Sequence, residues 1–233
     1  MRILDSNEYI NEKLVIQPVT RERLVDLKNP EIDDYIKDFI RENKLKWNTV
    51  TKSYDCDDDV EVSKNIVTGG KLKIRFGNVG GVFDCSYSNL TTLEGAPKKV
   101  GGYFDCSHNN LTSLEGAPQE VCGGFYCSFN NLATLEGAPN KIGGEFACNN
   151  NKLTTLEGAP NEVCGDFSCI GNNLTNLEGA PKEVGGVFNC AHNNLTTLDV
   201  APKKVGGDFN CYYNPNLVLP KEKPSWLKGE IIK

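Results

Sequence analysis

The sequence has few residues of several types and lacks several common patterns, and each of these absences excludes a class of function or location. Its 233 residues include two histidines, one methionine and two tryptophans. No apolar run approaches the roughly 18 residues needed to span a bilayer. The first residues, MRILDSNEYINEKLVI, carry acidic side chains where a signal peptide has its apolar core. We therefore expect no membrane partner, no export by the general route, and a cytoplasmic location.

Positive charge is also in deficit. Lysine and arginine together number 25 against 31 aspartates and glutamates, which gives a formal net charge of −6. A chain of this charge is poorly suited to the phosphate backbone of a nucleic acid. Hydrophobic residues make up 39% of the sequence, as in chains that bury a core. The composition therefore predicts a folded protein that does not bind nucleic acid.

What the sequence does contain is one 21-residue unit, written seven times between Val79 and Leu219. Its clearest copy is VGGYFDCSHNNLTSLEGAP, residues 100–118. Such a strict period is typical of a stack of units, none of which buries its apolar side alone. We predict a repeat solenoid over residues 76–219, a capping region over 1–75 and a C-terminal cap over 220–233. The unit is marked by Cys85, Cys106, Cys127, Cys148, Cys169, Cys190 and Cys211, each with Phe two positions earlier.

The unit can be interpreted position by position. In residues 104–107, FDCS, apolar and polar residues alternate, which predicts a short strand with Phe and Cys inward. Stacking at a fixed interval makes these strands parallel and in register. The Asn three residues after most of the cysteines is expected to bond the backbone of its turn and of the next coil. Leu111 and Leu114, with their equivalents, should return to the core.

The rest of the unit predicts turns and an extended arm. Proline in the Glu-Gly-Ala-Pro segment fixes φ and favours extended geometry before it, so the return arm should not be helical. The second Gly before each strand, from Gly81 to Gly207, marks a turn that needs either positive φ or close contact between backbones.

These motifs resemble those of the leucine-rich repeat family. F-x-C-x-x-N-x-L matches the L-x-L-x-x-N-x-L core of that family, with Phe and Cys in two Leu positions. The short unit and its L-T-x-L-x-x-x-P arm are similar to the compact bacterial class found in secreted effector proteins. The resemblance implies an α/β-type leucine-rich-repeat solenoid, with a parallel β-sheet on the concave face, extended return arms and a helical N-terminal cap. It also implies recognition of proteins.

The ten cysteines leave an open question about disulfides. The repeat column should point inward, where free cysteine packs as a small hydrophobe. Strands about 4.8 Å apart nevertheless permit an occasional disulfide between neighbouring coils. Cys122 and Cys164 lie two repeats apart, about 10 Å, which is too far to bond. We interpret the column as reduced packing residues, with disulfides or a metal cluster as alternatives.

Residues 1–75 are expected to be mainly helical and then to form short strands. Helices are predicted after Ser6 and after Thr20, and a third has Asn29 as its N-cap and Pro30 at its first position. The apolar stripe of this third helix should cover the first coil of the solenoid. Leu72 lies 21 residues before Leu93, so a degenerate coil is expected ahead of the seven clear ones. The stripe consists of Ile32, Tyr35, Ile36, Phe39 and Ile40.

Catalytic and metal-binding constellations are not found. His108 and His192 are four repeats apart, too far to share a metal ion, and the sequence has no Cys-x-x-Cys pair. The run DCDDDVE, residues 55–61, begins like a calcium-binding loop, but Val60 and Ile66 stand where such a loop needs Gly and Glu. We prefer a solvated acidic turn there. The sequence predicts no enzyme, no cofactor and no metal site.

Function is expected on the side chains that point outward from the strands. They mix aromatic rings with carboxylates, which predicts a protein partner with a basic surface. Tyr103, Tyr126 and Phe129 lie on adjacent coils and should form one apolar patch. Solubilising variation is the plainer alternative. The predicted protein-binding residues are Asp84, Tyr87, Tyr103, Asp105, His108, Tyr126, Phe129, Glu145, Asp166 and His192. A separate face is expected from Lys98, Lys99, Lys141, Lys182, Lys203 and Lys204 on the return arms.

The sequence thus predicts a non-enzymatic protein-binding module, an intracellular binder or inhibitor of another protein that acts through its concave face. The start of the chain, NEYINEKLVI, resembles N-termini of large tailed-phage proteins. The alternative is therefore a structural component of an assembly such as a phage virion, attached through the N-terminal segment. The location would be the cytoplasm of the host cell or the virion.

Overall fold

The computed structural model describes residues 34–233, and the chain divides into two compact units, residues 1–41 and 42–233. All but the last residue of helix α3 (Asp34–Glu42) lies in the first unit, and Ile36 and Phe39 of this helix are buried. This helix confirms part of the third predicted helix. The predicted N-cap at Asn29 and the two earlier helices lie outside the described residues.

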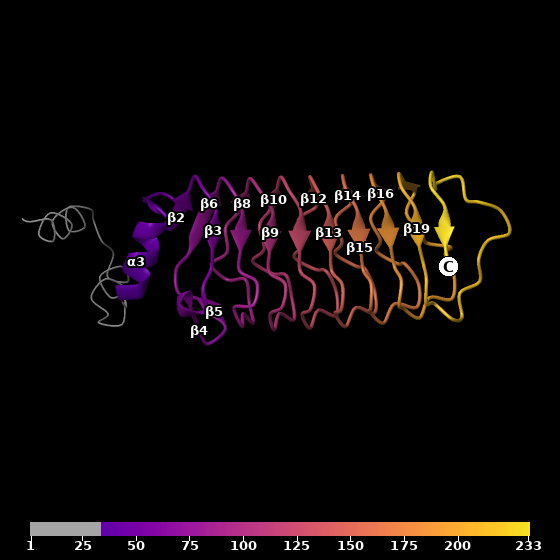
Figure 1. The fold of residues 1–233 in the computed structure, drawn as a ribbon, viewed down its shortest axis with the longest axis horizontal. Helices are drawn as coiled ribbons and strands as arrows, with labels where there is room; N and C mark the ends of the chain where they lie inside the picture. Colours follow the sequence, from indigo (N-terminus) through magenta and orange to yellow (C-terminus); the bar gives the residue numbers. More distant parts are fainter. Residues whose placement is uncertain (1–33) are drawn as a thin grey trace, which may run out of the picture. The chain divides into compact units, whose positions relative to one another are not determined.

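The second unit is a β-solenoid built from two nine-stranded sheets. Figure 1 shows the strands of each sheet following one another from coil to coil. Sheet A comprises β1 (Lys46–Asn48), β2 (Ser53–Cys56), β6 (Phe76–Val79), β8 (Lys99–Val100), β10 (Glu120–Val121), β12 (Lys141–Ile142), β14 (Glu162–Val163), β16 (Glu183–Val184) and β18 (Lys204–Val205). Sheet B comprises β3 (Val60–Glu61), β7 (Phe83–Asp84), β9 (Phe104–Asp105), β11 (Phe125–Tyr126), β13 (Phe146–Ala147), β15 (Phe167–Ser168), β17 (Phe188–Asn189), β19 (Phe209–Asn210) and β20 (Ile231–Ile232).

Sheet B contains the predicted Phe-x-Cys strands. Each Phe is the Cα partner of the Phe one repeat away, as with Phe104 and Phe125, so the prediction of parallel, in-register strands is confirmed. Sheet A was not predicted as a sheet. Its two-residue strands come from the end of the return arm, where an exposed charged residue precedes a buried Val or Ile, as in Glu120–Val121. The arm is therefore extended, and it also pairs with its neighbours.

The core consists of columns of identical side chains. The phenylalanines from Phe83 to Phe209 are fully buried, and their rings stack with centroids 5.1–5.7 Å apart. The seven repeat cysteines are also buried and free of disulfides, as predicted, whereas Cys122 and Cys164 are exposed. The two leucine columns complete the interior.

The turn between the two sheets depends on close approach of successive backbones. Gly123 N donates to Gly102 O at 2.9 Å and Gly144 N to Gly123 O at 2.9 Å, so the ladder of hydrogen bonds continues through the turn. A Cβ on Gly144 would lie 2.9 Å from Gly123 C. Of the two predicted reasons for these glycines, close contact therefore applies. Positive φ occurs instead in the Glu-Gly-Ala-Pro segment, for example at Gly116 (+90°).

The coil ahead of the seven clear repeats is present. Tyr54 pairs with Phe76 in sheet A and Val60 with Phe83 in sheet B, while β1 closes the edge of sheet A by antiparallel pairing with β2. This coil also carries a short 3-10 helix, η1 (Lys64–Ile66), and the antiparallel pair β4 (Val67–Thr68) and β5 (Lys71–Leu72).

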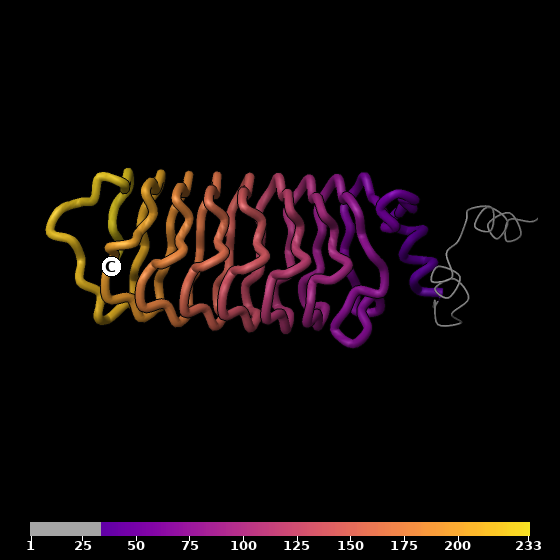
Figure 2. Tube along the Cα trace, turned by 180° about the vertical axis from the view of Figure 1, so that it is seen from behind, coloured from indigo at the N-terminus to yellow at the C-terminus, as the bar shows by residue number. Residues whose placement is uncertain are grey.

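The last coil is closed by the C-terminal residues. β20 pairs with β19, and Leu227 forms a parallel bridge with Val205. The ring of Trp226 packs edge-on against Phe209 with centroids 5.2 Å apart. Figure 2 shows the wide final loop leading back to this last coil. These residues lie over the last coil, as expected of the predicted C-terminal cap.

Candidate interaction surface

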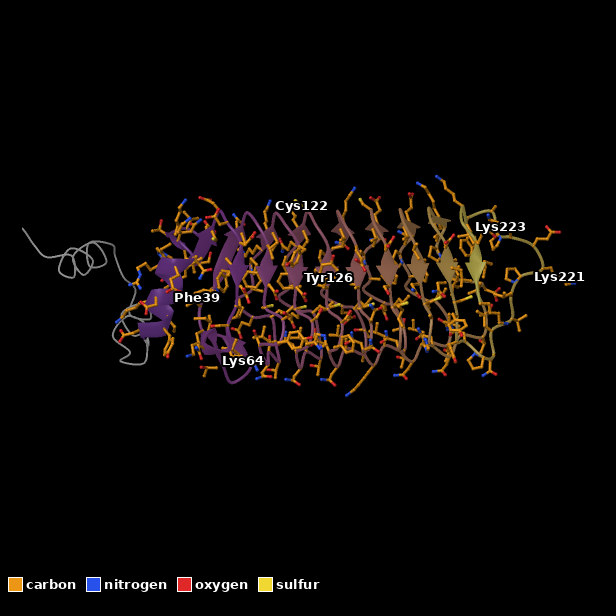
Figure 3. The ribbon with its side chains drawn as sticks, viewed as in Figure 1. Phe39, Lys64, Cys122, Tyr126, Lys221 and Lys223 are labelled. Carbon is orange, nitrogen blue, oxygen red and sulfur yellow. The ribbon has the colours of Figure 1, made fainter. Side chains whose placement is uncertain are left out.

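The candidate site is the outer face of sheet B over the coils that contain β3, β7, β9 and β11. It has three groups of side chains, which we name the aromatic ridge (Tyr87, His108 and Phe129), the carboxylate row (Glu61, Asp84 and Asp105) and the tyrosine pair (Tyr103 and Tyr126). In the strand direction, the row lies between the ridge and Tyr103, whereas Tyr126 is the Cα partner of Asp105 and follows the row on the next coil. Figure 3 labels Tyr126 on this face and Cys122 at the turn between the sheets.

The aromatic ridge is held in an unusual backbone conformation. Tyr87, His108 and Phe129 have φ of +52°, +54° and +56°, in the left-handed region that favours Gly and Asn. Two later coils place Asn150 and Gly171 at this position. A bulky residue there costs on the order of 1 kcal/mol. The three rings nevertheless stack nearly parallel, with centroids 4.1 and 4.3 Å apart.

The ridge is open to solvent despite this stacking. Tyr87 is 60% exposed and Phe129 is 47% exposed. Because the faces of the three rings stack on one another, the ridge exposes mainly the ring edges to solvent. These edges form one continuous strip along the three coils. Exposed rings held on a regular backbone lose little conformational entropy when they bind.

The carboxylate row places like charges directly opposite one another. Glu61 is the Cα partner of Asp84, and Asp84 is the partner of Asp105. Neighbouring strands lie about 4.8 Å apart, and like charges at this spacing destabilise a sheet. Asp84 Oδ1 accepts from Ser86 N and Asp105 Oδ1 from Ser107 N, each at 2.8 Å. These bonds fix the carboxylates on the outer face.

Burial and neighbouring charge together disfavour ionisation of Asp105. Burial raises the pKa of Asp105, and the Asp84 carboxylate raises it further, while the hydrogen bonds from Ser107 act in the opposite direction. The folded chain thus holds a partly buried negative charge beside a second one. A cation from a partner would relieve this repulsion.

Tyr103 borders the row on its other side, and Tyr126 follows Asp105 at the end of the row. Tyr103 and Tyr126 meet edge to face with centroids 5.8 Å apart. The side chain of Tyr126 lies across Gly124, where a Cβ would come within 2.6 Å of its hydroxyl oxygen. Burial raises the pKa of Tyr103, and the carboxylates of Asp84, Asp105, Asp59 and Glu61 add to the increase. The hydroxyl of Tyr103 is therefore surrounded by the acidic residues of this face.

The expected single patch of Tyr103, Tyr126 and Phe129 is not what the structure shows. Phe129 stacks on His108 in the ridge, and the two tyrosines contact each other. The left-handed backbone at Phe129 takes its ring out of the strand's alternation, which the sequence pattern alone does not reveal. The rings therefore form the ridge and a separate tyrosine pair, with Asp84 and Asp105 between the ridge and Tyr103.

The remaining predicted residues lie farther along the stack. Glu145 and Asp166 continue the column that contains Tyr103, and burial followed by the Asp166 charge raises the pKa of Glu145. Asp166 Oδ1 accepts from Val187 N at 2.7 Å, which gives it a structural role. His192 stacks on Tyr213 near the last coil, separated from the ridge by Asn150 and Gly171. The structure therefore gathers seven of the ten predicted residues into one site.

Two acidic residues of this surface were missed by the sequence analysis. Glu61 extends the row by one coil, and Asp59 accepts a hydrogen bond from Val82 N at 2.7 Å. The alternation Val60–Glu61–Val62 was the available signal, because it copies Phe83–Asp84–Cys85 one coil earlier. The 23-residue offset between Val60 and Phe83, instead of 21, concealed it.

The lysines do not form the uniform second face that was predicted. Lys99, Lys141 and Lys204 lie in strands of sheet A and pair with glutamates of neighbouring strands at 2.9–3.0 Å. The outer face of sheet A thus carries mostly opposite charges on neighbouring strands, with one like-charged pair, Glu162 and Glu183. Opposite charges at this spacing stabilise a sheet.

A second acidic column runs along the edge of the solenoid. It was not considered from the sequence, although its period is plain. Its members are all exposed, and the first of them pairs with Lys71 at 2.8 Å. We name it the glutamate edge, and it consists of Glu94, Glu115, Glu136, Glu157, Glu178 and Asp199.

The aspartate run near the first coil serves the fold. Asp57 pairs with Lys46 and Asp58 pairs with Lys44, while Asp55 Oδ1 accepts from Asn78 N. Each of these carboxylates interacts with a different partner, which supports the acidic turn rather than a calcium loop. Within residues 34–233, no group of three or more potential metal ligands is found. No helix in that part of the chain is long and apolar enough to cross a bilayer.

Comparison with known proteins does not assign this chain to a family. No protein-family model matches it, and neither a curated protein nor a solved structure shows significant similarity to it.

Proposed function

We propose that this chain is a non-enzymatic protein-binding module that acts through the outer face of sheet B. The observation that carries the proposal is the aromatic ridge. Three stacked rings, of which Tyr87 and Phe129 are exposed and His108 is half-buried, occupy left-handed backbone positions where Asn or Gly is the easier choice, as at Asn150 and Gly171. A strained conformation retained at an exposed site is a ground for assigning function.

The proposal extends to the repeat family, the N-terminal cap, the charge of the partner and the location of the protein. The short repeat with its Asn column and Leu columns supports a leucine-rich-repeat identity, with sheet B in the role of the binding sheet. The amphipathic helix α3 supports a helical cap for the first coil. The acidic row favours a partner with a basic surface, and we place the protein in the cytoplasm, acting as a binder or inhibitor of another protein.

The test compares two variants at equivalent positions of the repeat. Phe129→Asn removes a ridge ring and leaves a residue suited to left-handed φ, as Asn150 does. Tyr213→Asn makes the same change at φ of +53°, near the last coil. Proteins captured from lysate by the wild-type chain would be identified by mass spectrometry, and affinities measured with the purified partner.

We expect Phe129→Asn and Tyr126→Ala each to weaken binding by about 1 kcal/mol or more, as truncation of interface anchors does. Tyr213→Asn should leave the affinity unchanged. A partner that still binds the Phe129→Asn and Tyr126→Ala variants but is lost when Lys98 and Lys203 are reversed in charge would show that the wrong face has been chosen.

A further inference from the structure

The partner of this face can be specified further, on the basis of the proposed function. We propose that the occupant is an extended protein segment with two basic residues separated by one residue, its cationic heads on the carboxylate row and its aliphatic stems against the ridge and the tyrosine pair.

Charge complementarity is the first argument. In the described part of the chain, no lysine or arginine forms an ion pair with Glu61, Asp84 or Asp105. Sheet A shows that this repeat readily accommodates neutralising residues, because Lys99 faces Glu120 there. The row instead keeps acids in successive coils, so its charge is left for a cation from outside.

The aromatic columns are the second argument, and they are independent of the charge. Lysine and arginine bury their aliphatic stems on apolar surface while their charged heads stay near water or a carboxylate. The row has the exposed Tyr87 and Phe129 on one side and the half-exposed Tyr103 on the other. A basic side chain over this face therefore finds apolar contacts beside its counter-charge. An ordinary solvated acidic surface offers only the charge.

Spacing favours an extended segment. Three carboxylates on successive strands span two intervals, about 9.6 Å. In an extended chain, residues i and i+2 face the same side and lie about 6.7 Å apart, so two cations both fall within the row. Residues i and i+1 face opposite sides. An α-helix is about 10–12 Å in diameter, so its backbone would lie farther from the sheet. Fewer of its basic side chains could then place their aliphatic parts against the rings.

The test uses synthetic peptides and the full chain. Fluorescein-labelled, glycine-flanked peptides containing Arg-Ala-Arg, Ala-Arg-Arg or Glu-Ala-Glu would be titrated by fluorescence anisotropy. A helix-stabilised peptide with arginines at i and i+4 completes the set. We expect Arg-Ala-Arg to bind most tightly, Ala-Arg-Arg severalfold more weakly, and Glu-Ala-Glu not at all. Tighter binding of the helical peptide would overturn the extended geometry.

The matched variants separate a specific site from general attraction to an acidic protein. Asp84→Asn with Asp105→Asn removes two charges from the row while keeping the oxygens that accept from Ser86 and Ser107. Glu136→Gln with Glu157→Gln removes two charges from the glutamate edge, also from adjacent coils. We expect the row variant to lose roughly tenfold in affinity for Arg-Ala-Arg and the edge variant less than twofold.

Equal losses in the two double variants, with no loss in Phe129→Asn, would overturn the proposal in favour of non-specific attraction. Unchanged melting temperatures would show that the variants fold. If no basic peptide binds while a captured partner still depends on Phe129, this inference fails and the proposed function stands. If the partner is insensitive to both Phe129 and the row, both fail.

Discussion

At the scale of single residues, each buried asparagine of the repeat satisfies the backbone of two coils. Asn130 Oδ1 accepts from Leu111 N at 2.9 Å, and its Nδ2 donates to Cys106 O at 3.0 Å and Cys127 O at 3.1 Å. The groups thus bonded lie in turns where neither sheet reaches them. The side chain therefore replaces sheet pairing at the point where strand β11 has ended.

Asn130→Ala should destabilise the protein far more than Asn131→Ala, its neighbour with a half-exposed side chain. The first change leaves several buried backbone groups unpaired, at about 1–3 kcal/mol each, whereas the second should cost less than about 0.5 kcal/mol. Urea denaturation followed by circular dichroism measures both. Equal effects would mean that water or a relaxed turn replaces the lost bonds.

Residues inside the solenoid were predictable because every coil repeats the same environment. A strict period identifies Phe104, Cys106 and Leu111 as inward without reference to their partners. The surface is different, since its side chains vary between coils and their contacts depend on local backbone. Asn150 and Gly171 at the equivalent position are the sequence signal for positive φ at residue 129, but the stacking of Phe129 on His108 instead of Tyr126 had to be observed.

At the scale of elements, the solenoid is made of unusually short strands joined by a tight glycine turn. A two-residue strand such as β10 contains one inward and one outward residue, too few for alternation to be read. Sheet A therefore escaped the sequence analysis, while the longer Phe-x-Cys pattern revealed sheet B. The aromatic ridge and carboxylate row lie on the sheet that could be predicted, and the missed residue Glu61 lies in the coil whose period departs from 21.

The two glycines of the turn should respond differently to substitution. Cys122 and Cys164 occupy the first position, and Cys122 N donates to Val100 O at 3.0 Å, but a Cβ on Gly143 would overlap the carbonyl oxygen of Cys122 in the preceding coil. The second position is Gly in all seven repeats, and a Cβ on Gly144 would press on the backbone of the preceding coil at 2.9 Å.

We therefore expect Gly143→Ala to lower the free energy of unfolding by about 1–3 kcal/mol, the range for overpacking, and Gly144→Ala to lower it by less. Chemical denaturation of the two single variants measures the difference. A smaller effect at Gly143 than at Gly144 would mean that the turn relaxes around a side chain at the first position.

At the scale of the whole molecule, a property of one buried side chain is repeated in every coil, so its effect on stability adds up along the solenoid. Each repeat cysteine from Cys85 to Cys211 is fully buried. Burial raises the pKa of each of these thiols, because the interior disfavours the thiolate. In the unfolded chain they ionise near pH 8.5. Above that pH the folded state therefore holds more protons than the unfolded state.

Stability should consequently be complete below about pH 8 and fall steeply at higher pH. Each thiol contributes up to about 1.4 kcal/mol per pH unit, so seven together approach roughly 10 kcal/mol per unit, comparable with the whole stability of a typical domain. Urea midpoints measured under reducing conditions from pH 7 to pH 10 should show this decline. Removing two thiols, with Cys127→Ala and Cys148→Ala, should flatten the slope by about two-sevenths, even though it lowers stability at pH 7. A midpoint that stays constant up to pH 10, or an unchanged slope in the double variant, would contradict a buried and reduced cysteine column.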